Sequence, residues 1–320
     1  MSEIRLPEEP PPPPYVMPSV VHHPRESVWR YVALFLLTVA TTTMAGAGHY
    51  LSFSLGFTGG QNPFSTSQLM VLGLWYSVSI LAILGAHEFG HYFACRYYGV
   101  NVSLPYFLPV PLPLTGTLGA FIRIRQQIQS KRQLFDIGIA GPIAGFLVAV
   151  PVLMIGMYLS RVIEIPKTFN GEVYNLGEPL LFKAASWLTF GPLADGFTVN
   201  MHPMAFGAWF GLLATALNLF PMGQLDGGHI SYAVFGRKST IVTAVTVVCL
   251  IGLTFISMWW IVWTVLTVGM MLTFGIQHPQ TYDEAVPLDG PRLWLAAFAL
   301  LMFIVCFSPA PIEPLNLVTR

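Results

Sequence analysis

Long apolar runs, separated by short polar segments, occupy most of the chain after its first 28 residues. The runs are close to the roughly 20 residues that an α-helix needs to cross the hydrocarbon core of a bilayer. This pattern predicts an all-α polytopic membrane protein with about 6–7 transmembrane helices. The expected spans are residues 30–48, 70–95, 134–160, 203–222, 240–257, 258–276 and 292–308.

The two ends of the chain differ from this pattern. Residues 1–28 are polar and contain the run Pro10 to Pro14, which cannot bury enough apolar surface to fold. We therefore expect a disordered, proline-rich cytoplasmic tail at residues 1–28. A membrane-embedded core would follow at residues 29–308, with a C-terminal tail at residues 309–320.

One internal stretch, residues 104–125, does not have the pattern of a span. Four prolines within residues 105–113 rule out a helix, whereas Ala120 to Arg125 alternates apolar and basic residues as a strand does. We expect a small re-entrant β-hairpin or loop near the site described below. Two uses remain open: its edge pairs with an extended peptide, or the hairpin only covers the site.

The composition of the chain indicates its environment and limits its possible partners. Hydrophobic residues make up 54% and charged residues 9%, whereas soluble domains carry about a quarter charged residues, so the lipid bilayer is the expected environment. A formal net charge of zero gives no ground for a nucleic-acid partner. The cysteines Cys95, Cys249 and Cys306 are scattered, which argues against a disulfide framework and a thiolate metal site.

Basic residues in the short loops predict the orientation. With the expected spans they fall on one side, which the positive-inside rule makes cytoplasmic together with the N-terminus. The N-terminal segment does not resemble a transit peptide. We therefore expect an integral multi-pass protein of a bacterial plasma (inner) membrane.

The second expected span carries His87, Glu88 and His91 in the sequence His-Glu-Phe-Gly-His. Residues four apart share a helix face, so both imidazoles can reach one metal ion beside Glu88. Two histidines on Zn²⁺ and a glutamate that takes a proton from the attacking water are typical of metalloproteases. Each ionisable residue at a helix centre costs about 2.5–3.5 kcal/mol, which metal coordination offsets. Alternatively, the histidines only hydrogen-bond to neighbouring helices.

A zinc site of this kind needs a third protein ligand and leaves the fourth position to water. The sequence Asn218-Leu-Phe-Pro-Met-Gly-Gln-Leu-Asp226-Gly-Gly-His229 closes an expected span, 203–226, on the same side as His91. We expect Asp226 as the third ligand. His229 is a rival ligand, and an ordinary Asp-Gly turn is the alternative without metal.

The pair of segments HEFGH and NLFPMGQLDGGH resembles the site-2 protease family of intramembrane zinc metalloproteases, peptidase family M50. The stretch Gly-Thr-Leu-Gly-Ala-Phe-Ile-Arg at 116–123, the glycine-rich residues 140–145 and the segment His278-Pro279 are similar to the short branch that includes plant plastid and cyanobacterial members. Many relatives insert a PDZ module or append a CBS pair; we expect neither here, because no segment of this sequence has the length or polarity for one. We expect the glycines of residues 138–145 to let helices pack closely around the site.

The resemblance implies a zinc metalloendopeptidase with one Zn²⁺ per chain. It implies that His87, His91 and Asp226 bind the metal, that Glu88 is the base and that Asn218 is an amide donor to the oxyanion. The implied reaction is hydrolysis of transmembrane protein substrates near the cytoplasmic face, in regulated intramembrane proteolysis.

Two other classes of function stay open. An ion-coupled membrane transporter also places histidines and carboxylates within the membrane, although no repeat relates the two halves of this chain. A catalytically inactive, chaperone-like relative would keep the metal ligands, but metal binding alone does not require Glu88.

Overall fold

The computed structural model describes residues 27–57, 60–166, 173–274, 276 and 278–315. The described part of the chain is mostly helical, with five short strands between the helices and a sixth after the last helix. The disordered tail expected at residues 1–28 lies almost wholly outside the described residues.

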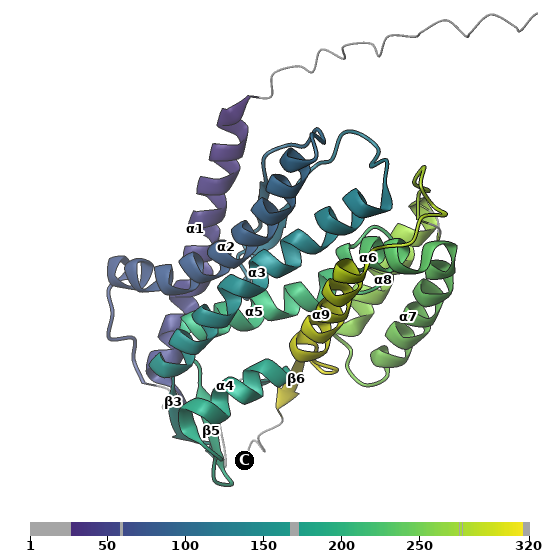
Figure 1. The fold of residues 1–320 in the computed structure, drawn as a ribbon. Helices are drawn as coiled ribbons and strands as arrows, with labels where there is room; N and C mark the ends of the chain where they lie inside the picture. The colour runs from purple at the N-terminus through teal and green to yellow at the C-terminus, as the bar shows by residue number, and fades with distance from the viewer. Residues whose placement is uncertain (1–26, 58–59, 167–172, 275, 277, 316–320) are drawn as a thin grey trace, which may run out of the picture.

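Three long helices form one side of the bundle: α1 (Val28–Leu55), α2 (Thr66–Tyr97) and α3 (Lys131–Leu159). α2 packs along both α1 and α3 (Figure 1). It begins at a capping box in which Ser65 and Gln68 each accept the other's backbone N–H. α3 begins where the Ser130 hydroxyl accepts from the N–H of Gln133.

Shorter helices complete the bundle. They are α5 (Pro203–Asn218), α6 (Asp226–Phe235), α7 (Ser239–Thr254), α8 (Trp260–Phe274) and α9 (Gly290–Cys306), with the 3₁₀ turn η1 (Gly236–Lys238) between α6 and α7. α5 packs against α2 and α3, and α6 packs against α3 (Figure 1). α3 therefore contacts all the helices that carry the predicted site residues.

The lengths of the helices modify the expected set of spans. Among the described residues, 4 runs are long and apolar enough to cross a membrane: Val28–Leu55, Thr66–Tyr97, Lys131–Leu159 and Asp226–Thr254. The last of these is not one straight helix, because Gly236 has a φ of 58° and ends α6. The span expected at 203–222 is a helix of 16 residues, about 24 Å long and shorter than a bilayer core of about 30 Å. The count of 6–7 crossings therefore stays a prediction.

The described strands pair as three antiparallel two-stranded sheets. β1 (Tyr106–Pro109) pairs with β2 (Thr117–Phe121), a hairpin within residues 104–125. The strand expected at Ala120–Arg125 thus begins and ends earlier, with an isolated bridge at Ile124. β3 (Arg161–Glu164) pairs with β5 (Phe197–Asn200), and β4 (Val173–Leu176) pairs with β6 (Ile312–Leu315). The remaining helix, α4 (Leu180–Phe190), lies between β4 and β5 in the chain.

The second and third sheets correct the expectation of an all-α fold with a single hairpin. Each of their strands has only four residues, too few for an alternating pattern to stand out. β6 also belongs to the segment 309–320, which the sequence indicated to be a tail. Its partner β4 lies far away in the chain, and local sequence carries no signal for such a long-range pairing.

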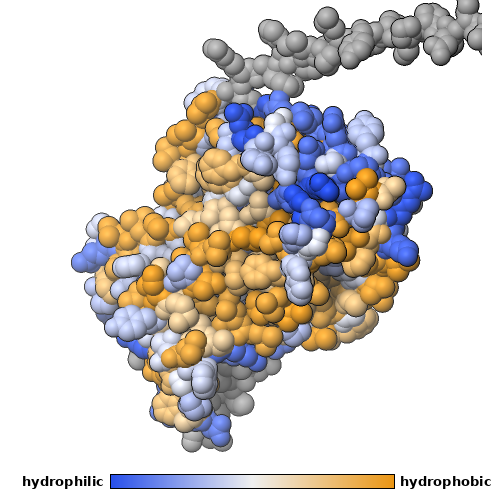
Figure 2. Space-filling model, viewed as in Figure 1, coloured by the Kyte–Doolittle hydropathy of each residue, from blue (hydrophilic) through white to orange (hydrophobic). Residues whose placement is uncertain are grey.

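The surface is apolar over much of its extent. Figure 2 shows a broad hydrophobic band across the visible face, with hydrophilic residues gathered at the upper right and toward the lower end. On α7 the side chains of Ile241, Val245 and Val248 are 58–68% exposed. An apolar surface of this size is unstable in water and is covered by lipid in a membrane protein. Together with the 4 long apolar helical runs among the described residues, it indicates a multi-pass membrane protein.

Candidate metal centre

α2 supplies three of the predicted site residues from two of its turns. His87 and His91 lie on one face, and their Nε2 atoms are 3.1 Å apart. Both histidines and Glu88 are buried. Because the two histidines are four residues apart, they lie on successive turns of α2 and point toward the same volume.

The third predicted ligand comes from a break between two helices. α5 ends at Asn218, and Pro221 prevents it from continuing. The chain then turns and starts α6 at Asp226, in the first turn of the new helix, where a carboxylate is favoured by the helix dipole. This corrects the expectation that Asp226 closes a span: it opens a helix after the break.

The break folds tightly onto the start of α6. A Cβ at Gly227 would lie 2.1 Å from the Leu219 carbonyl oxygen, and a Cβ at Gly228 would lie 2.4 Å from the Gly223 carbonyl oxygen. Both neighbours are backbone atoms that cannot move aside. The Gly-Gly pair after Asp226 is therefore needed for the close approach that sets the position of the carboxylate.

The break brings Asp226 to the two histidines. Its Oδ2 lies 3.1 Å from His87 Nε2, and its Oδ1 lies 3.3 Å from His91 Nε2. Two ligand atoms that each lie about 2.0–2.1 Å from a tetrahedral zinc ion are about 3.3–3.4 Å apart. The donor set therefore fits the predicted metal: one ligand atom from each residue lies within 4.8 Å of the other two, and the nearest atoms of each pair are 3.1–3.3 Å apart. Among the described residues, these three are the cluster of histidine, cysteine and acidic residues that could hold an ion.

A row of small residues on α3 makes room for this cluster. An added Cβ at Gly141 would lie 2.1 Å from His91 Nε2, and one at Gly145 would lie 3.1 Å from the Cβ of His87. On the facing helix, a Cβ at Gly90 would lie 2.5 Å from the Ala140 carbonyl oxygen. The expectation of close helix packing at residues 138–145 is confirmed, because only glycine leaves space for the imidazoles here.

α3 also orients one of the histidines. His91 Nδ1 lies 2.7 Å from the carbonyl oxygen of Ile137, which can only accept a hydrogen bond. Nδ1 therefore carries the proton, and Nε2 presents a lone pair toward Asp226 and His87. Such a partner on the far nitrogen is the usual support of a metal-binding histidine.

Two further predicted residues lie beside the cluster. The Nδ2 amide of Asn218 is 3.2 Å from His87 Nε2, so the last residue of α5 reaches the site. The Glu88 carboxylate accepts a hydrogen bond from the backbone N–H of Ile122, the residue that follows β2. The hairpin thus lies next to Glu88.

His229, the rival ligand, has a different partner. Its Nδ1 is 2.7 Å from Nε2 of His278, whose Nδ1 is in turn 2.7 Å from the carbonyl oxygen of Pro279. The ring of His278 stacks on Tyr232 at 4.4 Å between centroids. The cluster of possible ligands contains Asp226 and leaves His229 out.

The sequence predicted the candidate metal ligands and Glu88, but it did not predict the groups that contact the residues of the site. The Ile137 carbonyl has no sequence signal, because every residue has a carbonyl group. The pairing of His229 with His278 joins positions almost fifty residues apart, and neither spacing nor composition indicates it.

These features define a helical membrane protein in which two buried histidines and a partly buried aspartate converge from two helices, with a Glu beside them. The family model of peptidase family M50 matches residues 75–259, more than half of the chain and a range that includes every predicted site residue. The chain belongs to peptidase family M50. The family resemblance inferred from the HEFGH and LDGG segments is confirmed.

Similar proteins include several plant proteins whose names describe them as probable zinc metalloproteases of the chloroplast. EGY2 of Arabidopsis thaliana is 29% identical over 253 residues, 78% of this chain and 44% of the relative. EGY2 of Oryza sativa subsp. indica is 28% identical over 260 residues, 79% and 46% respectively. EGY1 of Oryza sativa subsp. japonica is 32% identical over 250 residues, 71% and 42% respectively. The chain thus spans less than half the length of these relatives.

Proposed function

We propose that this chain is a zinc metalloendopeptidase that hydrolyses peptide bonds of transmembrane protein substrates. The observation that carries the proposal is the convergence of His87, His91 and Asp226 at 3.1–3.3 Å, with Glu88 on the next position of the same helix. Membership of a peptidase family and the names of the relatives support zinc as the metal. The alternative of an ion-coupled transporter gains no comparable support from the family and the named relatives.

In the proposed mechanism, His87, His91 and Asp226 hold the metal. When bound, zinc supplies Lewis-acid activation of a water molecule and of the scissile carbonyl group. Glu88 accepts a proton from the water as its oxygen bonds to the carbonyl carbon. Glu88 then delivers that proton to the leaving nitrogen as the carbon–nitrogen bond breaks. Asn218 would donate its amide N–H to the oxyanion.

The substrate backbone would enter beside the hairpin. A helical peptide bond is shielded by its own hydrogen bonds, so the cleaved segment must become extended. Among the described residues the outer edge of β2 has no strand partner, and Ile122 connects this strand to Glu88. We propose that the extended segment adds to this edge, which favours the first of the two uses left open for the hairpin.

The membrane arrangement belongs to the same proposal. It comprises 6–7 crossings, a re-entrant hairpin, a cytoplasmic N-terminus and cleavage near the cytoplasmic face as part of regulated intramembrane proteolysis. The basic loop residues support the orientation. The names of the relatives place them in chloroplasts and give no support to a bacterial plasma membrane, so the membrane of residence stays a prediction.

The test compares Glu88→Gln with wild type, using the full chain in proteoliposomes with a single-span model substrate. Glu88→Gln is nearly isosteric but cannot accept the proton, so the cleavage rate is expected to fall about 10²-fold to 10⁴-fold while zinc stays near one per chain. Glu164→Gln, on an exposed position of β3, is the matched control and should cleave at the wild-type rate. Wild-type cleavage by Glu88→Gln would contradict the mechanism.

A further inference from the structure

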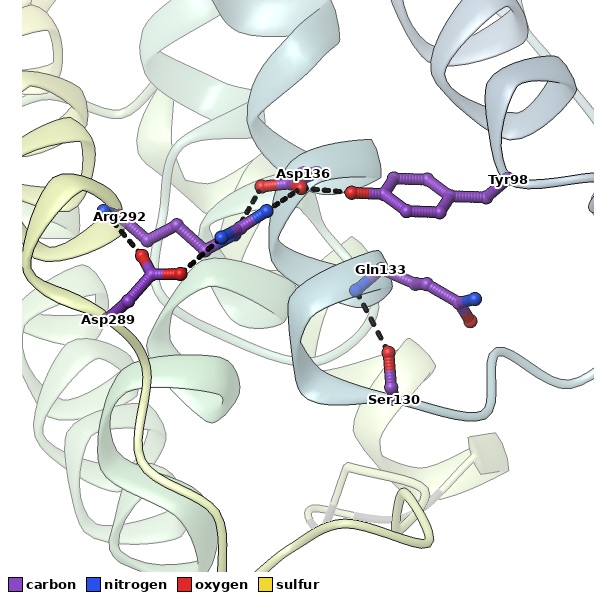
Figure 3. Close-up of polar contacts among 6 residues, drawn as sticks. All are labelled: Tyr98, Ser130, Gln133, Asp136, Asp289 and Arg292. Atoms are coloured by element: carbon purple, nitrogen blue, oxygen red, sulfur yellow. Dashed lines mark hydrogen bonds and ion pairs between the residues drawn. The ribbon is translucent and has the colours of Figure 1, made fainter.

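A second polar cluster lies at one end of the bundle, centred on Asp136 of α3 (Figure 3). Arg292 of α9 donates to both carboxylate oxygens of Asp136, with Nε at 2.9 Å and Nη2 at 2.5 Å. The hydroxyl of Tyr98, which caps the end of α2, donates to the same carboxylate. On its other side Arg292 donates to Asp289, the N-cap residue of α9.

This cluster is more buried than a surface ion pair and has a more specific geometry. The side chains of Arg292 and Asp136 are only 23% and 22% exposed, and the planar guanidinium meets both carboxylate oxygens. Bidentate pairs of this kind fix geometry as well as charge. Burial and the neighbouring Asp136 carboxylate raise the pKa of Tyr98, so its hydroxyl keeps the proton that it donates. Three helices, α2, α3 and α9, are thereby joined at one carboxylate.

The position of that carboxylate in the chain connects it to the metal centre. Asp136 immediately precedes Ile137, whose carbonyl oxygen lies 2.7 Å from His91 Nδ1. Tyr98 is two helical turns beyond His91 on the same helix. The cluster therefore joins α2 to α3 through one contact next to the His91–Ile137 hydrogen bond. That contact links Asp136, the residue before the carbonyl, to Tyr98 at the end of the helix that carries the imidazole.

We propose that the Tyr98–Asp136–Arg292 cluster positions the metal centre by holding the Ile137 carbonyl in register with His91. Asp136 and Arg292 are then positioning residues that act through the orientation of an imidazole, and α9 takes part in the site although none of its side chains reaches the metal. The inference rests on the proposed zinc site. It assigns a role to Arg292, which lies outside the matched family segment at residues 75–259.

A merely structural cluster and a positioning cluster differ in what their loss changes. Loss of a structural cluster lowers the stability of the metal-free and zinc-loaded protein alike and leaves zinc affinity unchanged. Loss of a positioning cluster frees the His91 ring and weakens zinc binding at similar stability of the metal-free protein. Removal of groups that orient a metal ligand typically costs about 10-fold to 100-fold in metal affinity.

The experiment measures zinc affinity of the purified full chain by competition with a chelator. The variants are Arg292→Met, Arg292→Lys and Asp136→Asn. Arg237→Met removes an Arg–carboxylate pair with Glu284, in which the Arg237 side chain is 73% exposed, and is the matched control. Circular dichroism and thermal unfolding of each metal-free protein report the fold. If Arg292→Met does not fold, the two milder variants decide.

We expect Arg292→Met and Asp136→Asn to bind zinc about 10-fold to 100-fold more weakly than wild type. Arg292→Lys keeps the charge without the bidentate contact and should recover part of this loss, and Arg237→Met should bind as wild type does. Affinities within twofold of wild type in both cluster variants would overturn the inference, as would an equal loss in Arg237→Met. Absence of zinc binding in wild type would instead contradict the proposed function.

Discussion

The two halves of the metal centre are built in different ways. The half on α2 is a continuous helix of 32 residues, in which two histidines share a face because of their spacing alone. The other half is a break, residues 219–225, after which Asp226 opens a new helix. In the first half the periodicity of the helix places the ligands, whereas in the second half close contacts between backbone segments do so.

This difference predicts where the site tolerates change. A helix of this length is held by packing along α1 and α3, so a single substitution seldom moves its residues. The break depends on Gly227 and Gly228, where a Cβ would meet carbonyl oxygens at 2.1 Å and 2.4 Å. The helical half is therefore sensitive mainly at its side chains, and the break is sensitive along its backbone.

The largest effect is expected from removal of Asp226, the ligand that follows the break. Asp226→Ala leaves two neutral histidines without a carboxylate, so zinc content should fall close to zero and cleavage should become undetectable. Metal analysis of the purified protein measures this. Asp195→Ala, in an exposed loop, is the matched control and should keep zinc and activity. Full zinc occupancy in Asp226→Ala would show that the helix start after the break does not supply a ligand.

An intermediate effect is expected at the other end of the break. Asn218→Ala removes the amide that lies 3.2 Å from His87 Nε2, and loss of an oxyanion donor typically costs about 10²-fold to 10³-fold in kcat. Zinc content should stay unchanged, in contrast to Asp226→Ala. Steady-state cleavage kinetics, with Asn62→Ala in an exposed loop as control, measure the difference. A loss of zinc together with kcat would make Asn218 a support of the ligands rather than an oxyanion donor.

The smallest expected effect concerns His91, in the half of the site that α2 supplies. A Cβ at Gly141 would lie 2.1 Å from His91 Nε2, so Gly141→Ala should displace the imidazole and weaken zinc binding about 10-fold to 100-fold. The imidazole can turn aside, so the thermal stability of the metal-free protein should change little. Gly48→Ala on α1, where a Cβ meets nothing within 4 Å, is the control. Unchanged zinc affinity would show that the glycine row is not needed by the ligand.

Prediction from sequence succeeded where chemistry follows helical spacing. His87, Glu88 and His91 form a local pattern, and the structure places all three as that pattern predicts. Asp226 was expected from an assumed topology and from the family resemblance, and the structure brings it to the histidines through a break instead of the end of a span. The Ile137 carbonyl and Arg292 were not found, because their contacts depend on which residues the tertiary fold brings together.

The same limit holds for the fold. Long apolar helices such as α2 and α3 follow from composition and length. The pairing of β4 with β6 does not, because it is a long-range contact. The early end of α5 at Asn218 is signalled by Pro221, which the expected span 203–222 ran across.

X-ray absorption at the zinc edge of the wild-type protein tests the ligand set most directly. The proposed site predicts one zinc per chain, four nitrogen or oxygen neighbours at about 2.0–2.2 Å, and multiple scattering from two imidazoles. Asp226→Ala loaded with excess zinc should lose one oxygen neighbour, whereas Glu88→Gln should give the wild-type spectrum. A sulfur neighbour at about 2.3 Å, or a third imidazole in place of the carboxylate, would contradict a centre shared between the α2 histidines and Asp226.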